Sequence, residues 1–208
     1  MSGQPQDGAV ENIRGAIEIM FAKPSGLARM DLSSAGLVVS FAALVIAGLI
    51  DASAYSLRHA EIFARLVAAD HPAEWSRLGY TLMNLLIALV SYAVSIFIVY
   101  LLATESEKTR VPDVVTVNNW AAPVVSLAVW PFVVLDYFQP SLRGGITMAM
   151  LGVLLCILVA GWQIMTISMN ATPGRGGWLF TVSAVTSLIV NASLERFVGL
   201  ASFAPPPA

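Results

Sequence analysis

The sequence predicts an all-α polytopic membrane protein, a bundle of five transmembrane helices with an N-terminal amphipathic interfacial helix. Of its 208 residues, 57% are hydrophobic and 12% are charged, whereas soluble domains average about 45–50% and about 25%. A mean hydropathy of +0.77 indicates that much of the surface faces lipid, because the apolar residues cannot all be buried in one water-facing fold. The charged residues also stand between long uncharged stretches, which locates the spans.

Each span is predicted from a stretch of at least 19 residues without Asp, Glu, Lys or Arg. About 20 residues of helix, at about 1.5 Å per residue, cross a hydrocarbon core of about 30 Å. Helices satisfy their own backbone hydrogen bonds, which lipid cannot do. The predicted helices lie near 34–55, 79–103, 118–138, 145–168 and 177–200.

Two other architectures do not fit the pattern. A β-barrel would alternate apolar and polar residues, whereas runs such as Leu85–Val90 are continuously apolar. A soluble helical bundle is excluded by the total hydrophobicity. The third span contains Pro123 and Pro131, each of which removes an intrahelical hydrogen bond, so we expect that helix to be kinked or broken.

The segments outside the spans are short. Residues 1–8 are polar and turn-rich, which predicts a disordered tail without the basic region of a signal peptide. Within the following segment, 9–33, apolar residues recur at helical spacing opposite Glu11, Arg14 and Glu18. This pattern predicts an amphipathic helix that lies in the membrane interface, packs on the bundle as a lid, or does both. The spans make up a domain over 34–203, and 204–208 is a second disordered tail.

The connection after the first span allows two readings. It has helical periodicity, so the first helix either continues past Asp51 or turns into a second interfacial helix ending at 70–72. The other connections are short, which predicts antiparallel neighbouring helices. Five spans place the two termini on opposite sides. Six Lys and Arg fall on the N-terminal side and five on the other, so the positive-inside rule weakly favours a cytoplasmic N-terminus.

Ionisable residues inside a span are costly and mark functional sites, but here they lie at span ends. Asp51 ends the first span, Asp136 the third and Glu195 the fifth, where each can reach the headgroups. Ser187, Asn191 and Glu195 share one face of the fifth helix. This polar stripe, together with Asp136, forms the candidate site, and it either hydrogen-bonds neighbouring helices or lines a water path.

Several other function classes find no support in the sequence. The net charge of −2 includes no basic stripe for a nucleic acid. The single cysteine, Cys156, cannot form an internal disulfide or a cysteine metal cluster. His59 and His71 fall outside the predicted spans and match no metal or haem spacing. We therefore expect no cofactor, no metal, no catalytic residue and no enzymatic activity.

The layout resembles that of the Yip1 family of small integral membrane proteins. The likeness rests on five spans in about 200 residues and on the N-terminal segment Ile17–Pro24 with its proline. The stretches Pro24–Ser33, with Phe41, and Thr116–Trp120 are similar to segments of uncharacterised bacterial multi-pass membrane proteins. The family resemblance implies a non-enzymatic scaffold or adaptor. It supplies no site residue, and this chain has no substantial soluble N-terminal domain like that of the trafficking members.

These observations lead to two functional hypotheses. The first is a non-enzymatic scaffold or accessory subunit of a bacterial inner membrane, bound to another membrane protein or to itself as a homo-oligomer. The second is a small transporter or channel with a polar path along the fifth helix. A hydrated cavity beside Asn191 and Glu195 would favour the second hypothesis, and satisfaction of polar groups by neighbouring helices would favour the first.

Overall fold

The computed structural model describes residues 8–68 and 75–200, and within these ranges it contains helices and no strand. Five helices are long and apolar enough to cross a membrane, which makes the chain a multi-pass membrane protein. They are α2 (Ser34–Ala68), α3 (Arg77–Leu102), α5 (Val111–Phe138), α6 (Arg143–Ser168) and α7 (Pro173–Phe197). The predicted all-α bundle of five transmembrane helices is confirmed.

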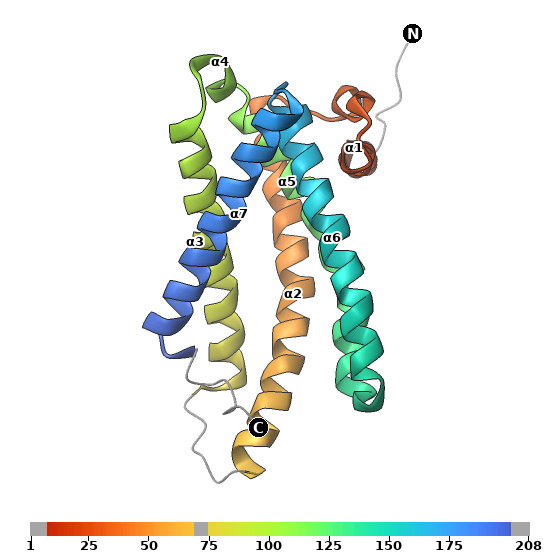
Figure 1. Cartoon of the computed structure of the whole chain (residues 1–208), viewed down its shortest axis with the longest axis vertical. Helices are drawn as coiled ribbons and strands as arrows, with labels where there is room; N and C mark the ends of the chain where they lie inside the picture. The colour runs from red at the N-terminus through yellow and green to blue at the C-terminus, as the bar shows by residue number, and fades with distance from the viewer. Residues whose placement is uncertain (1–7, 69–74, 201–208) are drawn as a thin grey trace.

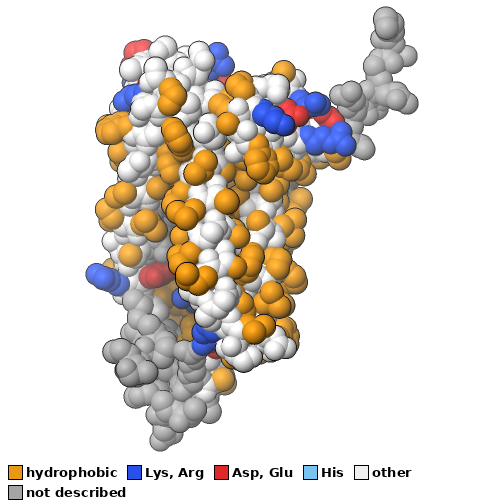
Figure 2. Space-filling model, turned by 45° about the vertical axis from the view of Figure 1, so that its right-hand side comes forward, with side chains coloured by type: hydrophobic (Ala, Val, Ile, Leu, Met, Phe, Trp, Pro, Cys, Tyr) orange, Lys and Arg blue, Asp and Glu red, His pale blue; other side chains and the backbone are white. Residues whose placement is uncertain are grey.

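The five helices run roughly along one axis (Figure 1). The closest pairings are α2 with α5 and α3 with α7, and α6 packs on α5 and α7. Apolar side chains cover the length of the face shown in Figure 2, and charged side chains gather towards its two ends. This distribution is the one expected for a bundle whose middle is surrounded by lipid.

Helix α2 is longer than its predicted span, because it continues without interruption past Asp51 to Ala68. Of the two readings left open by the sequence, continuation of the first helix is the one observed. His59 consequently lies inside α2 and is 5% exposed, with Nε2 3.0 Å from the Trp75 carbonyl oxygen. The expectation that both histidines lie outside the spans is therefore wrong for His59, and His71 lies outside the described residues.

Helix α5 begins at Val111, seven residues before the predicted boundary, and it is not broken at either internal proline. Pro112 is in its first turn, where the missing N–H would have no helical partner in any case. Ahead of it stands the short helix α4 (Glu105–Lys108), whose capping box joins Thr104 and Glu107. The predicted loop between the second and third spans is thus largely helical.

Helix α1 (Gly8–Met20) lies across the bundle axis at the end where α4 is found (Figure 1). It is followed by the 3₁₀ helix η1 (Pro24–Arg29). Ala16 and Ile19 are fully buried in a cluster with Val117 and Trp120 of α5. Helix α1 therefore packs on the bundle, as the lid reading expects, while its location at the membrane surface stays a prediction. The predicted tails 1–8 and 204–208 lie outside the described residues, except for Gly8.

Close packing near the α1 and α4 end holds the last two spans together. A Cβ atom added at Gly176 of α7 would clash with Oγ1 of Thr166 and would lie 2.7 Å from its Cα. Helix α6 ends beside this contact at Ser168, and Asn170, two residues later, has a φ of 49°. The Ala171 amide there donates to the Thr166 carbonyl, as in a Schellman termination. A short polar turn thus reverses the chain between α6 and α7.

Candidate functional site

The predicted polar stripe on α7 is partly buried. Ser187, Asn191 and Glu195 lie within α7 and all have intermediate exposure. Glu195 lies near Tyr55 of α2 and Tyr80 of α3, with which it interacts electrostatically. The stripe therefore approaches the α2 and α3 side of the bundle at its lower end, and its function stays a prediction.

The fourth predicted residue, Asp136, belongs to an ion-pair cluster at the same end of the bundle. Arg143, the first residue of α6, donates from Nε to Asp136 at 2.9 Å and from Nη2 to Glu61 of α2 at 2.7 Å. The three side chains are 28–42% exposed. Asp136 does lie at the end of its span, but it is held by a cation from the next helix, which was not predicted.

A buried polar network joins α2, α3 and α5, and sequence analysis did not find it. The Asn119 side chain is fully buried and donates to Ser40 Oγ at 2.9 Å, while Tyr92 donates its hydroxyl proton to Asn119 Oδ1 at 3.0 Å. Ser40 in turn donates to the Leu37 carbonyl at 2.6 Å. Pro123, four residues after Asn119, removes the helical donor for the Asn119 carbonyl. The partners of Asn119 are 79 and 27 positions away in the sequence, so no local spacing indicates the network.

Small residues accompany this network. Ala43 and Ala47 of α2 are 1% and 2% exposed, and Ser91 and Ser95 of α3 are 2% and 3% exposed. Each pair is spaced four residues apart, so both members face the same neighbour. Close approach at small residues is the usual way in which membrane helices associate. These residues and the Asn119 network hold the helices together.

The continuous α2 also places Asp51, a second ionisable side chain besides His59, inside the bundle. Asp51 is partly buried and interacts with Ser126 of α5 and with Tyr55 one turn further along α2. Asp51 precedes Glu61 by ten residues, and Ser126 precedes Asp136 by ten residues. At about 1.5 Å per residue, Asp51 lies about 15 Å from the charged cluster, or half of a hydrocarbon core of about 30 Å. The expectation that Asp51 ends the first span is therefore wrong.

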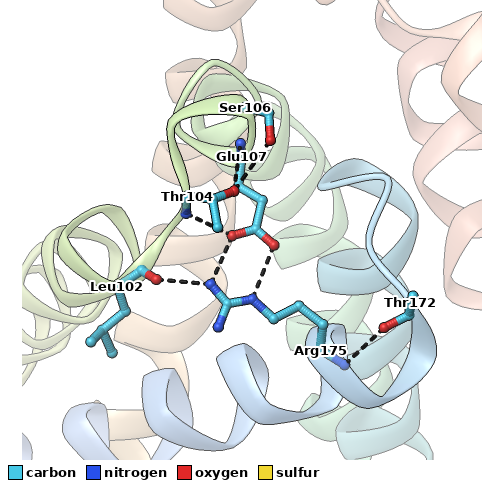
Figure 3. A network of polar contacts seen from close by, with 6 residues as sticks. All are labelled: Leu102, Thr104, Ser106, Glu107, Thr172 and Arg175. Carbon is cyan, nitrogen blue, oxygen red and sulfur yellow. Dashed lines mark hydrogen bonds and ion pairs between the residues drawn. The ribbon is translucent and has the colours of Figure 1, made fainter.

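At the opposite end of the bundle, Arg175 binds Glu107 in a two-pronged ion pair (Figure 3). The same carboxylate accepts the Thr104 backbone N–H at 2.8 Å, and Arg175 Nη2 also donates to the Leu102 carbonyl at 2.8 Å. The Arg175 guanidinium holds the pKa of the Glu107 carboxyl at about 2, well below its usual range, against the opposing effect of burial. This clamp fixes the α3–α5 connection to the start of α7.

Within residues 8–68 and 75–200, no group of three or more His, Cys, Asp or Glu side chains is arranged to hold a metal ion. Cys156 is exposed on α6. The polar groups that the structure brings together are carboxylates, guanidinium groups, amides and hydroxyls, and these bind one another across helix contacts.

Comparison with protein-family models, curated proteins and solved structures gave no match. The resemblance to the Yip1 family therefore rests on the sequence layout alone. The structure therefore supplies three candidate functional features by geometry alone. They are the Asn119 network, Asp51 beside Ser126, and the ion pairs of Arg143 and Arg175.

Proposed function

We propose that this chain is a non-enzymatic scaffold or accessory subunit of a multi-pass membrane assembly, with another membrane protein or a second copy as its partner. The observation that supports this proposal is that the buried polar side chains hydrogen-bond to neighbouring helices. Asn119 hydrogen-bonds to side chains from two other helices, and it is fully buried there. A side chain whose hydrogen bonds join neighbouring helices fixes the arrangement of those helices. It leaves no polar group free to line a water-filled path.

The outer faces of the bundle support the same proposal. Along α7, Leu188 and Ile189 are 70% and 61% exposed, whereas Leu179 is fully buried. Along α6, Met148 and Leu155 are 71% and 64% exposed. The helices thus present long apolar faces to lipid or to a neighbouring membrane protein. The proposed location is the bacterial inner membrane, with the N-terminus in the cytoplasm.

Cysteine crosslinking in native membranes tests the proposal. In a Cys156→Ala background, Leu188→Cys places a thiol on the outer face of α7, and Leu179→Cys places one in the interior of the same helix. A scaffold should give one discrete adduct with a bifunctional thiol reagent from Leu188→Cys and none from Leu179→Cys. Failure to form any discrete adduct, from Leu188→Cys and from a Leu155→Cys variant on α6, would count against a stable partner.

Asp51 favours a second candidate function, a small transporter or channel. An ionisable side chain at the middle of a membrane is costly, so such residues usually mark paths for protons, ions or substrates. Tyr55, Arg58 and Glu195 continue from Asp51 towards the lower end of the bundle through electrostatic contacts. Flux of protons or cations in reconstituted vesicles that Asp51→Asn abolishes and Ser126→Ala retains would establish this candidate.

A further inference from the structure

Helix α1 has an apolar face that the bundle leaves exposed. Val10 and Phe21 are 44% and 74% exposed, and Ile17 between them is partly exposed. The three residues are seven and four positions apart, so they share one side of the helix. The side that packs on the bundle is a different one, and it consists of the buried residues Asn12, Gly15, Ala16 and Ile19. The apolar face of Val10, Ile17 and Phe21 therefore meets whatever surrounds the bundle.

The remaining side of α1 is charged and is joined to η1. Glu11 accepts hydrogen bonds from Arg14 at 2.7 Å and from Arg29 of η1 at 2.9 Å. Arg29 also donates to Glu18 at 2.8 Å. Both carboxylates are thus neutralised by arginines of the same segment. Helix α1 consequently has three sides, of which one packs on the bundle, one is charged and one is apolar.

The turn between α1 and η1 fixes these two helices against each other. Ala22 has a φ of 61°, and the Lys23 amide donates to the Glu18 carbonyl at 2.8 Å, as in a Schellman motif. A Cβ atom added at Gly15 would lie 2.6 Å from the Gly26 carbonyl oxygen, so the two backbones are in close contact there. Residues 8–29 therefore form one unit, the α1–η1 unit, in which the apolar face has a fixed direction.

The depth of the α1–η1 unit is set by its contacts with α5. Asp113 and Asp136 stand near the two ends of α5 and are 23 positions apart, or about 35 Å at about 1.5 Å per residue. A hydrocarbon core of about 30 Å fits between them. Helix α1 packs on Val117 and Trp120, which are about 6–10 Å further towards the middle than Asp113. An amphipathic helix in the membrane plane is buried about 5–10 Å into the boundary of headgroups and acyl chains, which matches this depth.

The direction of α1 fits the same location. Helix α1 lies across the bundle axis, beside the five spans (Figure 1). A membrane that the spans cross is roughly perpendicular to this axis, so α1 runs along its surface. Charged side chains gather at the end of the molecule where α1 lies, and apolar side chains cover the face beyond them (Figure 2). This order of polarity is the one expected of an interfacial helix.

Lipid-facing side chains of the spans are found at the level of α1. Hydrogen bonds join α2 and α5 in the same order along both helices, Ser40 with Asn119 and Ser53 with Trp130. The two helices therefore run in the same direction, and Val38 is at about the level of Val117, on which α1 packs. Val38 is 71% exposed. The apolar face of α1 is thus continuous in depth with the surface that the spans present to lipid.

The size and charge of the α1–η1 unit favour a bilayer over a protein partner. Eleven positions separate Val10 from Phe21, which is about 17 Å of helix. With a helix width of about 10 Å the face offers about 170 Å², whereas a stable protein interface buries about 800 Å² on each partner. Residues 8–33 contain three acidic and three basic side chains, so the segment has no net charge that would attract anionic headgroups.

We propose that the α1–η1 unit binds the bilayer surface, with Val10, Ile17 and Phe21 inserted among the acyl chains beneath the headgroups. Lys23, which is exposed beside Phe21, extends its ammonium to the phosphates. The unit thereby fixes the depth of the bundle in its membrane. This surface is separate from the outer faces of α6 and α7 that are assigned to a partner, so it is independent of the proposed scaffold function.

Electron paramagnetic resonance of the spin-labelled full chain in phosphatidylcholine vesicles tests the proposal. In a Cys156→Ala background, single labels are attached at Phe21→Cys on the apolar face, at Arg14→Cys on the charged side and at Val38→Cys on α2. Oxygen concentrates in lipid and a nickel chelate in water, so their relative effects on relaxation report the depth of a label. The label at position 21 should respond more to oxygen, as the label at position 38 does, and the label at position 14 should respond more to nickel.

Two results would overturn the proposal. A response of the Phe21→Cys label to nickel as strong as that of the Arg14→Cys label would place the apolar face in water. A weak response of the Phe21→Cys label to both reagents would show that protein covers the face, either a second copy or another part of the chain. The Arg14→Cys change leaves Glu11 paired with Arg29, so the α1–η1 unit stays joined in this control.

Lipid charge gives an independent comparison. Vesicles with equal amounts of phosphatidylcholine and phosphatidylglycerol should leave the depth of the Phe21→Cys label unchanged, because the segment has no net charge. Insertion that occurs only with phosphatidylglycerol present would show that headgroup attraction holds the unit, which would contradict its assignment to the acyl chains.

A matched pair of variants tests the face itself. With the label at Val10→Cys, Phe21→Glu should abolish the preference for oxygen over nickel, whereas Phe21→Leu should preserve it. Phe21 is 74% exposed, so neither change disturbs the interior of the bundle. The same preference in both variants would contradict insertion of this face into the membrane.

Discussion

Arg175 and Glu107, which are 68 positions apart in the sequence, form a two-pronged ion pair with distances of 3.0 Å from Nε to Oε1 and 2.8 Å from Nη2 to Oε2. The pair joins the start of α7 to the connection between α3 and α5. The Glu107 side chain is only 13% exposed, so its carboxylate depends on this partner and on the Thr104 amide.

The first prediction concerns the pH dependence of this clamp. The pKa of Glu107 is about 2 in the folded chain and 4.5 is its ordinary value. A lowered pKa stabilises the folded state fully above the ordinary value, and that contribution is lost as the pH falls towards the folded value. Glu107→Gln should lower the free energy of unfolding by about 1–3 kcal/mol at pH 7. The difference between wild type and variant, measured by thermal unfolding in detergent, should shrink between about pH 4.5 and about pH 2.

An Arg175→Gln variant provides the control for this prediction. The double variant should be little less stable than either single variant, because each single change already breaks the pair. Additive losses would show that the two residues stabilise the fold independently.

The second prediction compares two glycines in the spans. Gly176→Ala places a methyl group in steric overlap with Thr166 Oγ1, whereas Gly152→Ala meets nothing within 4 Å. Overpacking of this kind costs about 1–3 kcal/mol, so Gly176→Ala should unfold at a lower denaturant concentration. Gly152→Ala should leave stability unchanged or raise it by up to about 1 kcal/mol, because alanine favours the helix. Equal effects would contradict the close contact of α6 and α7.

The third prediction concerns the buried network. Tyr92→Phe removes only the hydroxyl that donates to Asn119, and single hydrogen bonds between membrane helices are worth about 0.6 kcal/mol, with a maximum of about 1.7. Asn119→Leu should cost more, since it removes both side-chain hydrogen bonds and changes the shape of a fully buried side chain. Unfolding measured in mixed micelles gives both values. A larger loss for Tyr92→Phe than for Asn119→Leu would contradict the central role of Asn119.

The fourth prediction is the topology. An odd number of spans places the N- and C-termini on opposite sides, and the weak excess of Lys and Arg predicts that the N-terminus is cytoplasmic. Reporters that fluoresce only in the cytoplasm should be active at the N-terminus and inactive at the C-terminus. Activity at both termini would refute five spans, and activity at the C-terminus alone would reverse the orientation.

The five spans could be predicted because lipid excludes charge, so the uncharged stretches mark the helices directly. The same criterion places some boundaries wrongly. It stops the first span at Asp51 and starts the third after Asp113, although a helix tolerates an acidic residue wherever a neighbour or the surface accommodates it. The continuous α2 depends on tertiary contacts such as that of Asp51 with Ser126 of α5.

The polar sites were less accessible to sequence reasoning. Asp136 could be identified by its charge, but its partners Arg143 and Glu61 become visible only once α2, α5 and α6 are packed. Asn119 binds residues 79 and 27 positions away, so no local spacing indicates the network. Helical periodicity places Ser187, Asn191 and Glu195 on one face of α7, but periodicity alone does not assign partners to them.

The central claim is that the polar side chains inside the bundle join its helices and do not form a conduction path. Flux of protons and monovalent cations into vesicles containing the purified chain tests this claim most directly, with Asp51→Asn and Ser126→Ala measured beside the wild type. The scaffold account predicts that all three vesicle preparations leak no faster than protein-free vesicles. Flux through the wild type that Asp51→Asn abolishes, with its helix content and thermal stability unchanged, would contradict it.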